Sequence, residues 1–431
     1  MSDQIIYVNA RGPIRHALLI LPLLLALVAA WFFVRWYLGD TLAEYLNPDD
    51  RALQTAQIAA QLAPDDPLAH WQLAEALQRS LPQDQLGPAI KEYEAATRLS
   101  PNDYRFWLAL GRALEQSGDT AKGEKAMRRA VELAPSYAYP RWYLGNLLLR
   151  SGQEGEAFNE LRRSSESNAE LRPQIFSLAW QVYSKDFDAL KNAIGPTAER
   201  RAEFSKYLIE RKEFDAALRA WNDLSAKEKT DNHAAGESIM KSLLEAKRFR
   251  QALVVGNDLT TDEAARGRVG QLIDGGFEQA SDSSSVFGWQ IKSVQQALAA
   301  FDRTVHHGAS QSLRLQFQAR SELDFFNVSQ LVVLEAGAQY DLECFVKTRD
   351  LQSASTPIIQ VLDAADGSVL VSSQAVPTGD NDWQLMTLTF KTGPTTEAVT
   401  IRLSRAQCED ATLCPIFGTL WYDDFVMKSR K

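Results

Sequence analysis

The sequence predicts an α+β multidomain protein with an N-terminal transmembrane helix, an α-helical solenoid and a C-terminal antiparallel β-sandwich. An uncharged run of 18 residues begins at Ala17. Residues 47–270 show the three- and four-residue spacing of apolar side chains that is typical of helices, with self-similar segments 34 or 35 residues apart. From Asp274 onward alternation replaces that spacing and indicates strands. A chain of 431 residues exceeds one ordinary core, so several units are expected.

The composition is that of a folded protein, because 45% of the residues are hydrophobic and 23% are charged. The net charge of −9 argues against a nucleic-acid partner, since such binding depends on Lys and Arg that neutralise phosphates. Three cysteines and five histidines are too few and too scattered to suggest a structural zinc site.

Residues 17–38 are the predicted transmembrane helix. Twelve of the first 18 are Leu, Ile, Val or Phe, and this length crosses the hydrocarbon core of a bilayer. A cleaved signal peptide is the alternative, because Val28-Ala29-Ala30 resembles a processing site. The apolar run continues to Val34, beyond a usual signal core, and this favours an uncleaved anchor.

Charges on either side of this helix predict its orientation. Arg11 and Arg15 precede it, whereas Asp40 and Glu44 follow it. Since Lys and Arg concentrate on the cytoplasmic side, residues 1–16 are expected to form a cytoplasmic tail. Everything after the helix is then expected in the periplasm, with the helix in a bacterial inner membrane.

Two helical patterns in residues 101–135 predict a hairpin, and neighbouring segments repeat it. Gly145 follows Gly111 by 34 residues, as Pro135 follows Pro101. A single hairpin cannot bury its apolar face alone, so stacked neighbours are expected. The pattern resembles the tetratricopeptide repeat, whose consensus falls on Trp107, Leu110, Gly111, Leu114, Gly123, Ala130 and Pro135.

This resemblance implies regular repeats over residues 67–168. Trp71 precedes Trp107 by 36 residues, so we expect the two to be equivalent and separated by a two-residue insertion. Residues 51–62 are expected to be the second helix of an incomplete repeat that caps the array.

A second self-match extends the array. Residues 207–224 align with residues 242–259 at an offset of 35, with nine identities in 18 positions. Degenerate repeats are therefore predicted over residues 172–270, and the whole solenoid over residues 47–270.

The repeat resemblance implies a concave surface that binds a partner protein or peptide. A packing role for Trp107 and Trp142 stays open. The side chains from the helices expected to line the surface are Trp71, Tyr104, Trp107, Arg141, Trp142, Tyr143 and Asn146.

Alternating apolar residues predict strands at 312–317, 339–347 and 398–404, with turns between them. The C-terminal part, residues 271–431, resembles a jelly-roll carbohydrate-binding module of the galactose-binding-like kind. The motifs that carry the resemblance are Gly275-Gly276-Phe277-Glu278, Gly288-Trp289, His307-Gly308, Gly337-Ala338-Gln339-Tyr340, Trp383 and Trp421-Tyr422-Asp423-Asp424-Phe425.

That resemblance implies a structural calcium held by Glu278 and Asp424, with Asp423 as a weaker candidate. Calcium takes about six to eight oxygen ligands, both carboxylate and carbonyl. The alternative is that both carboxylates bond the backbone at the edge of the sandwich.

The resemblance also implies sugar binding by exposed aromatic rings, with protein contact or a spacer role as alternatives. Trp289 and Trp383 are expected in the core. The aromatic residues that remain as candidates are Phe287, Phe325, Phe326 and Tyr422.

Cys408 and Cys414 flank a short loop before the last strand. In an oxidising compartment we expect a disulfide there, which contributes about 2–3 kcal/mol to stability. Two reduced thiols are the alternative, and Cys344 is expected to be a buried small hydrophobe.

No serine-hydrolase elbow, phosphate-binding glycine loop or metalloprotease helix occurs in the sequence, so we expect a protein that is not an enzyme. The combined expectation is a membrane-tethered scaffold that supports bacterial surface polysaccharide synthesis or export. The main alternative is an assembly protein of a secretion or pilus apparatus without glycan contact, and a glycan-processing enzyme is a third reading.

Overall fold

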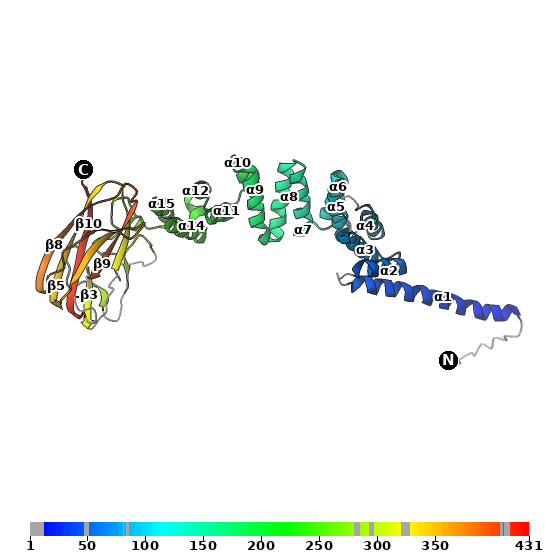
Figure 1. Cartoon of the computed structure of the whole chain (residues 1–431), viewed down its shortest axis with the longest axis horizontal. Coiled ribbons are helices and arrows are strands. Elements are labelled where there is room, and N and C mark those ends of the chain that lie inside the picture. Colours follow the sequence, from blue (N-terminus) through cyan, green and yellow to red (C-terminus); the bar gives the residue numbers. More distant parts are fainter. Residues whose placement is uncertain are drawn as a thin grey trace, which may run out of the picture. The chain divides into compact units, whose positions relative to one another are not determined.

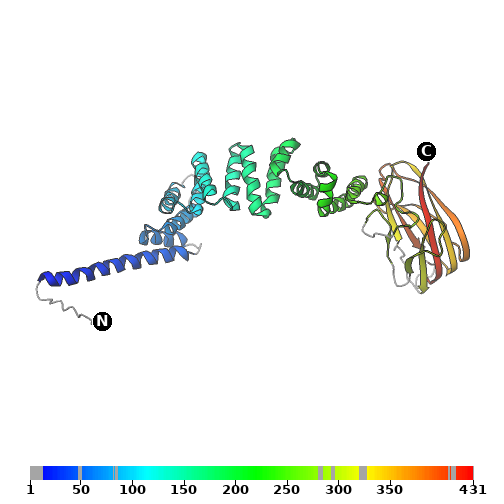
Figure 2. The same ribbon diagram turned by 180° about the vertical axis from the view of Figure 1, so that it is seen from behind.

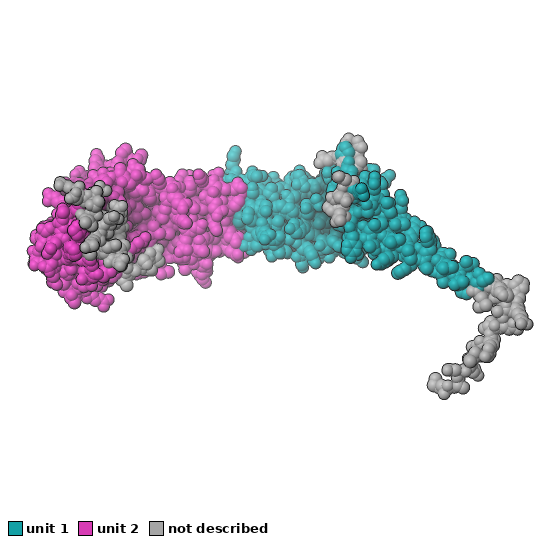
Figure 3. Space-filling model, turned by 60° about the horizontal axis from the view of Figure 1, so that its bottom comes forward, with its two compact units in different colours: residues 1–195 teal, residues 196–431 magenta. Residues whose placement is uncertain are grey.

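A computed structural model describes residues 13–46, 51–80, 82, 86–279, 285–292, 297–319, 328–405, 408 and 414–430. The expected tail falls mostly outside these ranges, as do Phe325 and Phe326. The chain divides into two compact units, residues 1–195 and 196–431 (Figure 3). The division coincides with Gly195-Pro196 and lies inside the range that the sequence assigns to one solenoid.

The first unit is entirely helical in its described part (Figure 1). Its elements are α1 Pro13–Glu44, α2 Ala52–Leu62, α3 Pro67–Ser80, α4 Gly87–Leu99, α5 Tyr104–Gln116, α6 Thr120–Leu133, α7 Ala138–Arg150, α8 Glu154–Ser167, a 3-10 turn Ala169–Leu171, α9 Arg172–Tyr183 and α10 Phe187–Ile194. From α3 onward each odd-numbered helix packs on the next, giving four hairpins in sequence. The first three hairpins occupy the range over which the regular repeats are predicted.

Helix α1 contains the apolar run. Between Ile20 and Glu44 it is long and apolar enough to cross a membrane, by length and composition. The large apolar side chains between Ile20 and Leu38 are exposed to solvent. Such a surface is unfavourable in water and suits a lipid environment.

The end of α1 also completes the first hairpin. Ala43 is buried in one cluster with Ala59 of α2. Gly39 approaches α2 so closely that an added Cβ would lie 2.6 Å from the Cβ of Ala63. Helix α2 is therefore the second helix of a repeat-like pair, as expected, and the last turns of α1 supply the first.

Glycines allow the regular hairpins to pack tightly. A Cβ added at Gly111 would lie 3.0 Å from the carbonyl oxygen of Gly123, and one at Gly145 would lie 2.7 Å from Cγ of Leu161. The turn between α5 and α6 has Gly118 at φ +93°, a conformation that L side chains rarely adopt. Gly111 therefore lets the backbones of α5 and α6 approach closely.

The second unit begins with more helices. They are α11 Ala198–Glu210, α12 Phe214–Asn222, α13 Ala226–Asp231, α14 His233–Glu245, α15 Phe249–Leu259 and a 3-10 turn Glu263–Ala265. Lys212 and Lys247 occupy the two hairpin turns at φ +65° and +61°. They are 35 residues apart, which is the offset of the self-match.

A β-sandwich follows (Figure 2). Its strands are β1 Gln290–Ile291, β2 Ala297–Asp302, β3 Ser312–Ala319, β4 Val328–Val333, β5 Gln339–Ser353, β6 Pro357–Asp363, β7 Val369–Ser372, β8 Gly379–Lys391, β9 Ala398–Arg405 and β10 Ile416–Arg430. They form two antiparallel sheets, in the orders β1-β4-β9-β6-β7 and β2-β3-β10-β5-β8. The three predicted strands are β3, β5 and β9, and their alternating apolar residues face one core.

Helix α15 and the segment that follows it are joined to the sandwich by polar contacts. Arg250 donates to Glu335 at 2.8 Å, and the backbone N–H of Gly270 donates to the carbonyl of Val333 at 2.8 Å. Gln330 donates to the carbonyl of Ile273 at 2.8 Å. These contacts explain why the last repeats and the sandwich form one compact unit.

Candidate functional site

A groove on the helical face of the first unit is the candidate partner-binding site. It has a volume of about 490 Å³ and lies on one face of α3, α5 and α7. The repeat brings equivalent positions together there, because Arg112 and Asn146 are 34 residues apart, as are Gln116 and Arg150. Its lining residues are Gln78, Arg112, Glu115, Gln116, Trp142, Tyr143, Asn146 and Arg150.

The groove combines a cation, aromatic rings and amides. The Arg112 guanidinium lies over the Tyr143 ring, 4.5 Å from its centroid, in a cation–π contact. Arg150 donates to Glu115 at 2.8 Å. The Gln78 amide donates to the side-chain oxygen of Gln116 at 2.6 Å.

Three residues of the odd-numbered helices do not line the groove but bond the backbone at the start of a hairpin. His70, Trp107 and Arg141 each bond the carbonyl of the proline six residues earlier, at N···O distances of 2.9, 2.9 and 3.0 Å. His70 is therefore the equivalent of Trp107, and the alignment of Trp71 with Trp107 is wrong. The insertion is three residues, because a sequence distance alone does not show which residue faces the neighbouring helix.

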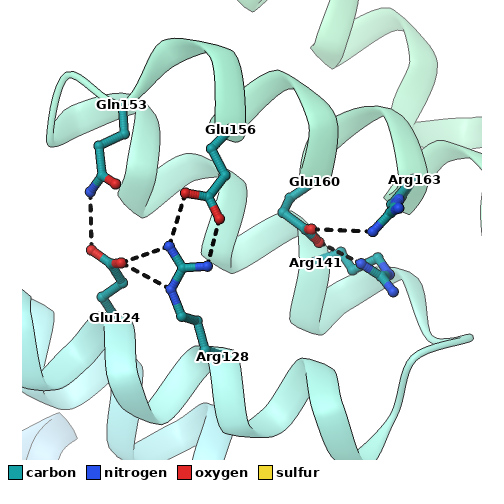
Figure 4. A network of polar contacts seen from close by, with 7 residues as sticks. All are labelled: Glu124, Arg128, Arg141, Gln153, Glu156, Glu160 and Arg163. Carbon is teal, nitrogen blue, oxygen red and sulfur yellow. Dashed lines mark hydrogen bonds and ion pairs between the residues drawn. The ribbon is translucent and has the colours of Figure 1, made fainter.

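Arg141 is also held by an ion-pair network (Figure 4). It donates to Glu160 of α8 at 2.6 Å, and both side chains are nearly buried. Nearby, Arg128 of α6 bonds Glu124 and also Glu156 of α8, which links neighbouring hairpins. Arg141 thus points toward α8 and does not line the groove.

The structure separates the predicted partner-binding residues into two groups. Trp142, Tyr143 and Asn146 line the groove. Trp71 packs near Phe106 with ring centroids 6.1 Å apart, and Tyr104 packs on Tyr137 at 5.1 Å. The groove residues that the sequence analysis missed are Gln78, Arg112, Glu115, Gln116 and Arg150, although the 34-residue spacing from Asn146 would have identified Arg112.

A larger hollow of about 670 Å³ lies in the second unit, between α14, α15 and the first loop of the sandwich. Its lining includes Phe287 and Trp289, which are buried, together with exposed His233 and Glu237. Its lining does not come from equivalent positions of the repeats, so size alone does not make it the candidate site.

The sandwich carries an aromatic cluster on the outer face of the β2-β3-β10-β5-β8 sheet. The His307 ring stacks on Phe345, with centroids 3.6 Å apart, and meets Trp383 edge-on at 5.7 Å. Cys344 and Val346, the strand neighbours of Phe345, face the core instead. Trp383 is half-buried in this cluster, so its expected place in the core is wrong.

The other aromatic residues considered from sequence are buried. Trp289 is 5% exposed and belongs to the core, as expected. Phe287 is 5% exposed and Tyr422 is fully buried, so neither can stack on a sugar. Sequence reasoning missed Phe345 and His307, because a His-His pair in a turn does not reveal which strand it covers.

Glu278 and Asp424 come close to each other beside Gly276. A Cβ added at Gly276 would lie 3.5 Å from Asp424 Oδ1 and 3.8 Å from Glu278 Oε1. Both carboxylates already accept hydrogen bonds, Glu278 from the Ser310 backbone at 2.9 Å and Asp424 from His307 at 2.7 Å. Burial opposes ionisation, but the Ser310 bonds outweigh it and lower the pKa of Glu278.

The calcium at these residues stays a prediction. Within the described ranges, no three His, Cys, Asp or Glu side chains gather into a group suited to a metal ion. Two carboxylates supply only part of the oxygen ligands that calcium takes, and backbone carbonyls would have to supply the rest.

A disulfide joins Cys408 and Cys414, with Cα atoms 5.6 Å apart. The Arg405 guanidinium donates to the carbonyl of Cys414 at 3.1 Å and so ties this end of the loop to β9. Cys344 is buried, and burial raises the pKa of its thiol, which makes it a poor nucleophile.

The fold and the groove define a helical-repeat scaffold for protein interaction joined to a β-sandwich. Residues 83–138 match the family described as "Tetratricopeptide repeat". No curated protein sequence matches the chain.

Solved structures resemble separate parts of the chain. "MamA 41-end from Desulfovibrio magneticus RS-1" is 24% identical, covers 32% of this chain and 75% of its own, and has a TM-score of 0.28. "Crystal structure of YrrB: a TPR protein with an unusual peptide-binding site" is 15% identical, covers 48% of this chain and 92% of its own, and has a TM-score of 0.26. "CBM4 structure and function" is 16% identical, covers 37% of this chain and 99% of its own, and has a TM-score of 0.28. Similarities at these TM-scores carry no argument about function.

Proposed function

We propose that the chain is a membrane-tethered scaffold whose groove binds an extended segment of a partner protein. The groove itself carries this proposal. Arg112 is exposed, and Trp142 and Tyr143 are half-buried beside it. Arg, Trp and Tyr are the residue types enriched in protein interfaces.

Helix α1 supports the tether. Its exposed apolar surface needs a lipid environment, and its last turns are part of the helical array. A bacterial inner membrane with the bulk of the chain in the periplasm agrees with the Lys/Arg bias and with a disulfide, which forms in oxidising compartments.

The outer face of the sandwich favours a polysaccharide context over the alternative. Phe345, His307 and Trp383 form a partly exposed aromatic surface, and rings of this kind stack on sugar faces. We therefore place the scaffold, without catalysis of its own, in surface polysaccharide synthesis or export. A secretion or pilus assembly protein would need no such surface.

Site-directed photocrosslinking in native membranes tests the groove. A crosslinking amino acid at Asn146, inside the groove, is expected to capture a specific partner. The same group at Glu132, exposed on α6, serves as the matched control. Capture that is equal at both positions, or that survives Trp142→Ala, would contradict groove binding.

Glycan arrays probed with the full chain in detergent test the polysaccharide context. We expect the chain to bind a glycan and Phe345→Ala to remove that binding. Phe417→Ala, at an exposed position of β10, should leave the binding unchanged. Absence of any glycan binding would favour the secretion or pilus alternative.

A further inference from the structure

The residues that line the groove carry one more positive charge than negative charge, because Arg112 and Arg150 face a single lining carboxylate, Glu115. The other arginines of α5 and α7 form ion pairs, namely Arg105 with Asp103, Arg141 with Glu160 and Arg150 with Glu115. Arg112 is exposed and, within the part of the chain that the structure describes, forms no ion pair.

The pairing of Arg150 explains why Arg112 remains unpaired. Glu115 lies one turn after Arg112 on α5, at the i,i+3 spacing at which helical ion pairs form. Arg150 of α7 engages the Glu115 carboxylate through two nitrogens instead. The stacking on Tyr143 meanwhile holds the Arg112 guanidinium in place, which lowers the entropy lost when a ligand binds.

The stretch of sequence that contains α5, α6 and α7 is also positively charged. Residues 101–150 contain eight Lys or Arg against five Asp or Glu, although the whole chain has a net charge of −9. Four of the eight basic residues belong to α6 and do not line the groove. The groove itself has Arg112 and Arg150 against Glu115, and this excess of one positive charge favours an acidic ligand.

Amide groups beside Arg112 suit the backbone of an extended peptide. Asn146 uses its nitrogen to bond the carbonyl of Trp142 at 2.8 Å, which leaves its side-chain oxygen to accept a peptide N–H. Gln116 accepts from Gln78 through its oxygen, which leaves its nitrogen to donate to a peptide carbonyl. The half-buried Trp142 ring adds an apolar contact at the same site.

We propose that the groove selects an extended partner segment that places a carboxylate against Arg112 and an apolar side chain against Trp142. This deepens the proposed function and rests on it. Arg112 recognises the carboxylate through charge-assisted hydrogen bonds, and Arg150 acts as a positioning residue because it keeps Glu115 away from Arg112.

Display selection with the full chain in detergent micelles tests the proposal. The probe is a library of random 12-residue linear peptides, followed by a synthetic pair: the selected peptide and its isostere with Asn for Asp and Gln for Glu. Selected peptides are expected to contain an acidic residue near an apolar one. The isostere should bind the wild-type chain about tenfold more weakly, as expected for loss of a charge-assisted hydrogen bond.

Variants separate recognition from folding. Arg112→Gln should bind both peptides equally weakly, and Arg112→Lys should recover part of the preference. Arg150→Gln should lower affinity for the acidic peptide alone, because Glu115 is then released toward Arg112. Arg129→Gln, which changes an arginine paired with Glu132 on α6, should leave affinity unchanged.

Two outcomes would overturn the proposal, and they differ in scope. Peptides that lose binding with Trp142→Ala but show no preference for acids would overturn carboxylate selection and leave the groove as a binding site. Peptides that bind regardless of Trp142→Ala, or no selected peptide at all, would overturn both the proposal and the proposed function.

Discussion

At the residue scale, one task is carried out by three different side chains. His70, Trp107 and Arg141 all use a ring or guanidinium nitrogen to bond a proline carbonyl at the entry to a hairpin. The carbonyl follows a helix end and lacks an intrahelical partner, so any well-placed N–H group satisfies it. Residue identity alone therefore does not reveal the equivalence.

Replacing Trp107 by Phe tests this task. The change keeps most of the packing but removes the donor to Pro101, so we expect the α5–α6 hairpin to lose about 1 kcal/mol of local stability. Hydrogen exchange of the α5 and α6 amides in the full chain measures it. Tyr139→Phe, at an exposed position, is the control, and equal protection in both variants would contradict the prediction.

Asp302 makes the stability of the sandwich dependent on pH. Burial opposes its ionisation, but hydrogen bonds from Trp421, Thr304 and Val305 outweigh burial and lower the pKa to about 2. Because the folded pKa lies below the unfolded value, this stabilisation is present above pH 4 and is lost as the pH falls toward 2. Thermal unfolding of wild type should decline over that range, and Asp302→Asn should decline less.

The calcium hypothesis predicts a metal-dependent sandwich. If Glu278 and Asp424 hold calcium, adding EGTA should lower the melting temperature of the second unit, and Glu278→Gln should remove that response. Differential scanning calorimetry with and without calcium measures the effect. Equal melting curves in both conditions would mean that the two carboxylates serve only their Ser310 and His307 bonds.

At the scale of elements, α1 combines a membrane-type surface with the first helix of the array. The change occurs near Gly39, where the exposed apolar side chains end and close packing on α2 begins. Because α1 packs on both α2 and α3, we expect a movement of α1 to move these helices as well.

Gly39→Leu tests that connection. A side chain at this position has no room beside Ala63, so we expect about 1–3 kcal/mol of local destabilisation in the first hairpin. Hydrogen exchange of the α2 amides reports it. Ala30→Leu, on the exposed part of α1, is the matched control. A similar response from both variants would show that α1 and α2 do not depend on this contact.

At the scale of the whole molecule, the two compact units bring different surfaces to one chain. The first provides a groove of repeat positions, and the second provides an aromatic face on a sandwich that is bonded to its own pair of degenerate repeats. A scaffold of this kind can bind two kinds of partner.

The orientation of the chain in the membrane is a prediction about the whole molecule. A phosphatase reporter fused after Lys431 should be active in the periplasm, and Cys408 and Cys414 should resist thiol labelling until a reductant is added. Changing Arg11 and Arg15 to Glu should weaken this orientation. A reporter active only in the cytosol would contradict the envelope role.

Local patterns in the sequence determined which segments are helices or strands and how long each repeat is. Hydrophobic periodicity records which face of a segment is apolar, and glycines such as Gly111 record where helices approach, so the hairpins and the strands around Tyr340 and Ile401 were predictable. These features depend on neighbouring residues in one element.

Only the tertiary structure decided which residues face the groove and which surfaces of the sandwich are aromatic. Three features depend on how two distant elements align. They are the position of Arg112 over Tyr143, the equivalence of His70 (and not Trp71) with Trp107, and the stacking of His307 on Phe345. That alignment follows from packing summed over many contacts, and a sequence spacing does not show where an insertion is absorbed.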